Sequence, residues 1–478
     1  MKPFTSLCLA LASACFAVTA VLAARPQYGG TLRVAIAATI RSADPAAAPA
    51  DATEAAARDR VLPLAFETLT RIDAASGLQP SLAASWESDA RGARWRFRLR
   101  SGVTLHSGVP LESWQVAAAL RARESRWTVS TDGDVVVVDL PEPAGDLPWR
   151  LADVGHAIVV RSPDGPMLGT GPFRVDRLDA DALSLRSYDG YRSGRPFVDA
   201  VRIQMGRPAS TQVSDLEAGR ADLVSVHPLD ARRLAARGMR LFASRPLELV
   251  AVVFEPHRAT DAYLPIRQAF ASALNRATMA SVLLQQRADP AHALLPPWLS
   301  GYDLVTRRSE TSSRASSNVV SGFSRTELNR AEQRELTLRV DASDALAQSI
   351  AERIAVDERE AGLSVKVQAA AGLAPRADAR LVRIRLAADA PDRALAALVA
   401  RLGPRATSDA SPQTTVGAAL AGIYRAESDL LARSVIVPVV HLPELYAASD
   451  QLASWASGPI LPSGEWDFAD LWLRTARP

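Results

Sequence analysis

The side chains that most often perform covalent or metal chemistry are scarce in this sequence. Its two cysteines, Cys8 and Cys15, lie near the N-terminus, and Lys366 is the single lysine beyond Lys2. Lys366 has neither a glycine-rich phosphate loop nor a serine three residues before it, which excludes P-loop and Ser-x-x-Lys chemistry. No two histidines lie closer than thirty positions, so an i, i+4 zinc pair is excluded. The histidines are His106, His156, His227, His257, His292 and His441.

Sequence signatures of nucleotide and acyl chemistry are also missing. Residues 169–174 (GTGPFR) lack the third glycine of a dinucleotide loop and run into a strand pattern, so they predict a turn. The sequence has no Gly-x-Ser-x-Gly elbow. We therefore predict no catalytic residues, no cofactor and no metal site. A secreted hydrolase built from scattered Ser, His and Asp residues is the alternative of another class.

The composition is that of a folded globular protein. The chain has 478 residues, of which 48% are hydrophobic and 22% charged, which is enough for about three structural units. Its net charge is only +3, and nearly all of its basic residues are arginines scattered along the chain. Without a concentrated basic run, a nucleic-acid partner is not expected.

The N-terminus has the pattern of a secretory signal peptide. Lys2 precedes an apolar stretch, residues 7–22, which is followed by the small residues Ala23 and Ala24. We predict a signal peptide over residues 1–23, an exported mature chain without cysteine, and a periplasmic location. A lipid anchor through Cys15 is the alternative, disfavoured because the apolar core continues beyond it.

Short strand patterns alternate with helical ones, which predicts a mixed α/β fold that must position any site. The expected strands are residues 31–37, 173–175, 183–185, 201–203, 335–340 and 362–367, and the expected helices are 210–219, 264–286 and 344–360. A new βαβ-like unit is expected to begin at residue 335. Two polar stretches, 301–324 and 403–415, are expected to be loops.

A second pattern predicts antiparallel strands. Apolar Trp95, Phe97 and Leu99 alternate with arginines over residues 94–100, so we expect one buried face and an arginine-bearing wet strand edge. Asp132 and Gly133 lie between two valine-rich segments and predict a hairpin turn.

Several segments of the chain form a recognisable series when taken in order. They are residues 28–34 (YGGTLRV), 66–73 (FETLTRID), 78–87 (LQPSLAASWE), 95–103 (WRFRLRSGV), 105–111 (LHSGVPL), 169–173 (GTGPF), 191–201, 216–223 (LEAGRADL) and 266–276. In this order they resemble the extracytoplasmic solute-binding proteins of ABC importers, specifically the large peptide- and nickel-type family. The resemblance covers most of residues 28–302 and thins beyond them.

The resemblance implies a two-lobed periplasmic-binding-protein fold with mixed sheets flanked by helices, a hinged cleft and an enlarged first lobe. Lobe I would hold residues 25–257, including an extra subdomain over about 50–165. Lobe II would hold 258–437, and residues 438–478 would return to lobe I. The chain would cross near residues 253–255 and 437–439. The protein would be a monomer that delivers its ligand to an ABC permease in the inner membrane.

The resemblance also suggests where a ligand binds. A peptide's buried ammonium group needs a carboxylate, which family members carry in a Gly-Trp-x-x-Asp stretch and which falls here on Asp389. Ala37, Ala38 and Thr39, after the first strand, are candidates for ligand backbone contacts, and Trp298 is a candidate for lining a pocket. His106 is expected to be structural.

A peptide is the expected ligand. A nickel–chelator complex, haem or an oligosaccharide is the second choice, because the pattern is poorest in the half that forms the pocket. Loss of transport in favour of another exported role is a third, and a purely structural or partner-docking protein is another class.

Overall fold

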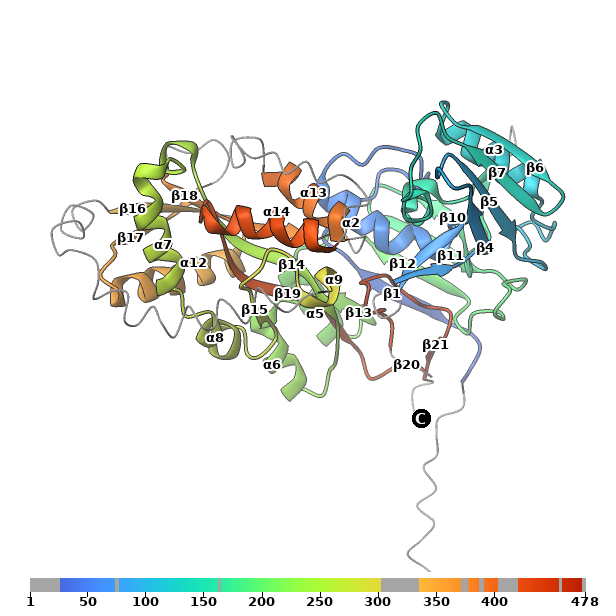
Figure 1. Ribbon diagram of the computed structural model, residues 1–478. Helices are drawn as coiled ribbons and strands as arrows, with labels where there is room; N and C mark the ends of the chain where they lie inside the picture. Colours follow the sequence, from blue (N-terminus) through green and yellow to red (C-terminus); the bar gives the residue numbers. More distant parts are fainter. Residues whose placement is uncertain are drawn as a thin grey trace, which may run out of the picture.

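The computed structural model describes residues 26–73, 77–161, 165–301, 335–370, 377–386, 391–402, 420–454 and 458–474. Within these ranges an 11-stranded mixed sheet runs the length of the molecule (Figure 1). Its order is β10 (Phe173–Leu178), β11 (Ala182–Ser187), β12 (Ala200–Gln204), β1 (Thr31–Ala35), β13 (Leu223–Ser225), β19 (Ile436–Ala448), β14 (Arg240–Phe254), β18 (Ala379–Arg385), β16 (Leu336–Asp341) and β17 (Val365–Ala370), with β15 (Asp289–Pro290) paired to β19.

The first half of this sheet packs against two apolar clusters. Strand β1 pairs in parallel with β12 and β13, and its Leu32 and Val34 are buried with Ile203. Three helices flank this half: α2 (Ala52–Val61), α5 (Ala209–Glu217) and α6 (Pro228–Ala236). The strands and the helix expected here are confirmed, although β1 ends two residues earlier than predicted.

The second half is built on the predicted βαβ unit. Strands β16 and β17 pair in parallel and are joined by α12 (Ala345–Glu360), which begins at Asp344, whose side chain accepts a hydrogen bond from Ala347 N at 2.9 Å. The other helices of this half are α7 (Leu264–Ala273), α8 (Arg276–Thr278), α9 (Pro297–Ser300), α13 (Pro391–Leu402) and α14 (Leu420–Ala432).

The single helix predicted over residues 264–286 is wrong. Helix α7 stops at Leu274, whose ψ is 120°, and the Asn275 side chain then caps α8 by accepting from Thr278 N. The backbone N–H of Asn275 donates to Asp357 on α12 at 3.0 Å, which fixes the break. Asparagine favours such caps, and this tertiary contact overrides the apolar periodicity.

A separate sheet covers part of the first half. It has the order β4 (Ala83–Ser88), β5 (Arg94–Leu99), β7 (Val135–Asp139) and β6 (Thr128–Asp132), and α3 (Ser113–Arg123) packs on it. The predicted hairpin is present, with Gly133 at φ 59°. The predicted strand edge is wrong, because β5 lies between β4 and β7, and its arginines form ion pairs with Asp139, Asp132 and Asp134.

The glycine pair Gly169 and Gly171 forms a close backbone approach. A Cβ at Gly169 would lie 2.1 Å from Ala65 O. The buried ring of His106 lies against this segment: Nδ1 accepts from Gly169 N, and Nε2 contacts Gly171 O, each at 3.2 Å. Burial lowers the pKa of His106 to about 4, so it is neutral at pH 7 and structural.

Two long neighbouring strands connect the halves. Antiparallel β14 and β19 run through the middle of the sheet (Figure 1). Phe242 and Tyr446 pack with the first core, whereas Val250 and Val439 pack with the second. Between these ends the register shifts from Ala243 to Pro246 and from Pro246 to Glu248, so pairing is irregular where one core gives way to the other.

The remaining strands form three small pairs: β2 (Thr70–Asp73) with β3 (Gly77–Pro80), β8 (Val160–Arg161) with β9 (Met167–Leu168), and β20 (Leu452–Ser454) with β21 (Leu471–Leu473). A short helix, α4 (Leu147–Arg150), precedes β8. Among the residues given above, no helix combines the length and apolar character needed to cross a membrane. The predicted signal peptide and its cysteines, and nearly all of the two predicted polar loops, lie outside those ranges.

Candidate ligand-binding site

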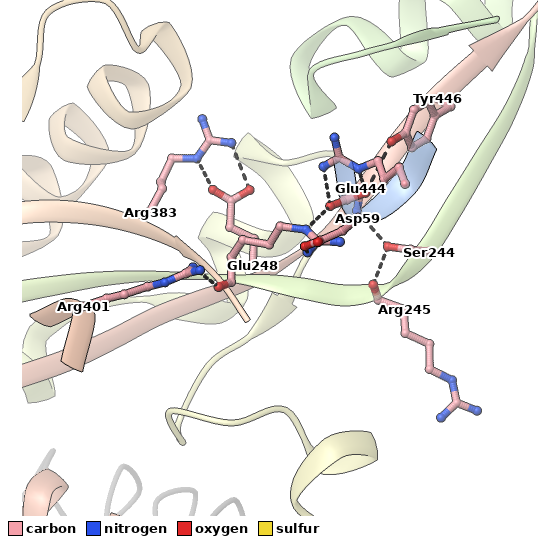
Figure 2. A network of polar contacts seen from close by, with 10 residues as sticks. Asp59, Ser244, Arg245, Glu248, Arg383, Arg401, Glu444 and Tyr446 are labelled. Atoms are coloured by element: carbon pink, nitrogen blue, oxygen red, sulfur yellow. Dashed lines mark hydrogen bonds and ion pairs between the residues drawn. The ribbon is translucent and has the colours of Figure 1, made fainter. Parts of the chain in front are cut away.

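A carboxylate at the irregular part of β19 joins elements from both halves. Glu444 accepts a bidentate pair of hydrogen bonds from Arg60 of α2, at 2.9 and 2.7 Å, and one from Arg385 of β18, at 2.8 Å. Arg385 also lies 3.3 Å from Asp59 of α2. We call Asp59, Arg60, Arg385, Glu444 and Tyr446 the junction network (Figure 2).

Charge–charge interactions among these residues decide their protonation states. Burial alone would raise the pKa of Glu444, but the charges of Arg60 and Arg385 outweigh it and lower the pKa to about 2. Burial raises the pKa of Tyr446 to about 12, so its hydroxyl stays protonated and donates to Glu444 at 3.3 Å. Glu444 is therefore ionised at neutral pH, and its side chain is only 12% exposed.

A second set of ion pairs lies beside the junction network on the second half. Arg383 of β18 donates to both carboxylate oxygens of Glu248 on β14, at 2.6 and 3.0 Å, and to Asp344 at 2.7 Å. Burial lowers the pKa of Arg383, but the charges of the two carboxylates raise it by more. The pKa therefore lies above its usual value, and Arg383 keeps its charge. Because Asp344 also caps α12, Arg383 ties β14, β18 and α12 together.

The irregular stretch of β14 is tied to Glu444 through its backbone. The hydroxyl of Ser244 donates to the carbonyl of Arg245 at 2.5 Å and accepts from Glu444 N at 2.9 Å, as Figure 2 shows. At this register shift the Ser244 hydroxyl therefore takes the place of a strand partner for the backbone N–H of Glu444.

A turn from the C-terminal part of the chain packs against Leu247 of β14 and Glu444 of β19. Gly464 has φ 84°, and a Cβ there would lie 2.4 Å from Leu247 Cδ1 and 3.4 Å from Glu444 Oε2. Burial raises the pKa of the next residue, Glu465, to about 7; the charge of Arg71 opposes this and that of Asp59 adds to it. The charges of Asp59 and Arg385 in the junction network thus act on a carboxyl whose pKa is near neutral.

A pocket of about 430 Å³ lies between the two halves and shares no residue with the junction network. Its walls come from the segment around α4 and from α13 of the second half, where Arg393 forms an ion pair with Asp146 at 3.5 Å. It is lined by Pro143, Ala144, Gly145, Asp146, Arg150 and Arg393.

The predicted site residues that the structure describes lie in different elements. Ala37 is exposed, and Ala38 accepts a hydrogen bond through its carbonyl from Gly206 N at 3.1 Å. Thr39 is half-buried, with Oγ1 3.6 Å from where a Cβ of Gly206 would lie. Trp298 is also half-buried, but it lies on α9, where its indole N–H donates to Pro246 O at 2.9 Å.

The predicted anchor Asp389 lies outside the described residues. Sequence reasoning also missed the junction network and the pocket. One signal could have found part of the network: Glu444 is a charged residue within an otherwise apolar strand, and a buried carboxylate needs partners. Its arginine partners lie 384 and 59 positions away, beyond any local pattern.

The sequence of this two-part fold matches a known protein family. Residues 77–394, more than half of the chain, match the family described as bacterial extracellular solute-binding proteins, family 5 Middle. The chain belongs to this family. It has the two-lobed periplasmic-binding-protein fold expected from the sequence.

Individual relatives are more distant. The chain is 31% identical to the uncharacterized protein YhjP of Bacillus subtilis (strain 168) over 160 residues, which cover 30% of this chain and only 27% of YhjP. A crystal structure of an ABC transporter substrate-binding protein from Sinorhizobium meliloti has a TM-score of 0.70 at 20% identity and covers 93% of this chain and 100% of its own. The oligopeptide-binding protein AppA of Bacillus subtilis, solved with a nonapeptide, has a TM-score of 0.63 at 17% identity, with coverage of 94% and 100%.

Proposed function

We propose that this protein is the monomeric, periplasmic solute-capturing component of an ABC importer. It holds a peptide between lobe I (residues 25–257 and 438–478) and lobe II (258–437), and passes it unaltered to a permease in the inner membrane. The observation that carries the proposal is the pair β14 and β19, whose regular pairing is interrupted between the apolar clusters of one half and those of the other. Bending within two adjacent strands is a hinge motion.

The proposed bend lies at the bulge, nearer Ser244 than the residues 253–255 expected from the sequence. Residues 250–254 of β14 are in regular register with β18 and belong to the second half's sheet and cores. The stretch from Ala243 to Glu248 has two of the three register shifts with β19 and no continuous ladder with it; the third shift lies between Val250 and Ala251. The interrupted pairing with β19 there allows local changes of φ and ψ, which suits a hinge.

Native mass spectrometry of the freshly purified protein tests the function. We expect a noncovalent ligand, identified as a peptide after release, and recovery of the same peptide unchanged after incubation. Adding it to ligand-free protein should raise the melting temperature. Cleavage of the peptide would favour the hydrolase instead, and a bound metal chelate, haem or sugar would favour the second choice of ligand.

Asp389 is proposed to pair with the ammonium group of that peptide. Asp389→Ala should weaken peptide binding at least tenfold, because a charge-assisted hydrogen bond is lost. Calorimetric titration measures this, and a circular dichroism melt checks the fold. The exposed Asp450 offers a matched control, since Asp450→Ala should bind like the parent protein. Parent-like affinity of Asp389→Ala would remove Asp389 from the site.

A further inference from the structure

One ion pair of the junction network joins the two halves away from β14 and β19. Asp59 lies in the last turn of α2, in the first half, and its carboxylate is 3.3 Å from Nη1 of Arg385. Arg385 is the last residue of β18, in the second half. It pairs with Glu248 of β14, where the regular ladder with β18 begins, directly beside the proposed bend. A rotation at the bend therefore moves the two partners of this ion pair relative to one another.

Glu444 has a different position, because it lies within the interrupted stretch of β19 itself. It accepts hydrogen bonds from Arg60 of the first half and from Arg385 of the second. An anion at the pivot of a rotation stays close to both of its partners. Asp59 lies on a helix that moves with the first half, so separation of the halves breaks its contact with Arg385 first.

Asp59 contributes little to its own helix. A carboxylate in the last turn lies at the negative end of the helix dipole, and aspartate is a poor helix former. The Asp59 side chain is 46% exposed, and burial raises its pKa although the charge of Arg385 opposes this. The ion pair thus offsets the cost of desolvation only in part. Such a contact is weak enough to break and re-form as the halves move.

The position of Arg385 gives the direction of the effect. Arg385 ends β18, and Asp389, which is proposed to hold the ammonium group of the peptide, follows four positions later. Ligands of α/β proteins bind outside the carboxyl ends of strands. The contact with Asp59 is therefore on the side of the halves on which the proposed function places the peptide. A contact between the halves on that side favours their closure.

We propose that Asp59 and Arg385 form a latch that favours closure of the two lobes and strengthens peptide capture without touching the peptide. The inference rests on the proposed function and adds its regulation: the empty protein already samples the closed arrangement, and the latch sets how often it does so. Asp59 is a positioning residue in this scheme. Because the latch changes only the population of the closed state, its loss should weaken different peptides by the same factor.

The test follows the distance between the lobes by single-molecule fluorescence on the purified mature protein. The mature chain expected from the sequence has no cysteine, so dyes can be attached at Ala122→Cys on α3 and Glu352→Cys on α12, both exposed positions. Without peptide, Asp59→Asn should lower the ratio of closed to open molecules about two- to fivefold, the scale of an exposed ion pair. Asp59→Glu, which keeps the carboxylate, should restore the ratio.

Asp176→Asn is the matched control. Asp176 is 43% exposed and forms an ion pair with Arg186 at 3.4 Å, but both residues belong to the first half. Its ratio of closed to open molecules should equal that of the parent. Melting curves should show that all variants fold, so that a shift in the ratio cannot come from unfolding.

Titration calorimetry with trialanine and pentaalanine measures the second consequence. Asp59→Asn should weaken the binding of both peptides by the same factor, about two- to fivefold. An unchanged closed fraction in Asp59→Asn, or weaker binding of one peptide alone, overturns this inference and leaves the proposed function standing. A single distance between the lobes in the parent, with and without either peptide, overturns the proposed function and this inference together.

Discussion

Glu444 in the junction network and Glu358 on α12 are both carboxylates withdrawn from water, but their surroundings differ. Glu444 accepts hydrogen bonds from two arginines and a tyrosine. Glu358 is fully buried, and in the described part of the chain neither of its oxygens has a hydrogen-bond partner. Burial and the adjacent Asp357 raise its pKa to about 9, although Arg276 opposes the shift. One glutamate is ionised at pH 7, and the other is protonated.

The comparison shows that burial alone does not decide what a carboxylate contributes. At the junction, the partners come from α2, β18 and β19, so the charge of Glu444 depends on contact between elements of both halves. Within the second half, the pKa of Glu358 is set mainly by the cost of removing its carboxylate from water. We therefore expect the free energy of unfolding to change in opposite directions when each glutamate is replaced by glutamine. Its dependence on pH should also have opposite signs at the two sites.

Neutralising Glu444 should have the largest effect. Glu444→Gln leaves Arg60 and Arg385 without their common anion and should lower the free energy of unfolding by about 3–5 kcal/mol at pH 7. Since the folded pKa is lowered to about 2 from 4.5, this stabilisation is present above pH 4.5 and is lost as the pH falls towards 2. Urea denaturation at several pH values measures both.

Glu142→Gln is the control for this variant, because the Glu142 side chain is 85% exposed and its contact with Arg126 is 3.6 Å long. Its stability should stay within about 0.5 kcal/mol of the parent. A similar small effect for Glu444→Gln would contradict the role of the junction network.

Neutralising Glu358 should have a smaller effect of the opposite sign. Its folded pKa is about 9 against 4.5, so the parent protein loses stability as the pH rises from 4.5 towards 9. Glu358→Gln removes this dependence and should be more stable than the parent by roughly 1–3 kcal/mol at pH 8, and nearly equal to it at pH 4.5. Glu360→Gln, an exposed change on the same helix, is the control. Destabilisation by Glu358→Gln at pH 8 would show that Glu358 is ionised and paired.

The smallest effect is expected at an exposed pair of the separate sheet. Arg98 and Asp134 are 2.9 Å apart, but their side chains are 58% and 59% exposed. Arg98→Ala should change the free energy of unfolding by less than about 0.5 kcal/mol, because water and salt screen the pair. A loss above 2 kcal/mol would mean that ion pairs stabilise this protein irrespective of burial.

Much of the fold could be predicted because its signals are local. The alternation of residues 94–99, the Asp-Gly hairpin turn and the N-cap at Asp344 each act within one or two elements. The resemblance supplied the order of the elements and the two-lobed architecture. Periodicity failed at Asn275, where a contact with α12 ends the helix, because a local pattern contains no information about a partner 82 positions away.

The candidate site was much harder to predict for the same reason. The junction network combines residues from three distant segments and the pocket residues from two, and their properties depend on distances and burial. Asp389, Ala37, Ala38, Thr39 and Trp298 stay predictions as ligand contacts. The bonds of Trp298 with Pro246 and of Ala38 with Gly206 show that polar groups in these segments already have structural partners.

The central sheet, which both halves share, has a consequence for how the protein melts. Strands β14 and β19 each contribute side chains to the cores on both sides, so unfolding either half removes neighbours from the other. Heat should therefore disrupt both lobes in a single cooperative transition, and a small molecule that stabilises one lobe protects its companion as well.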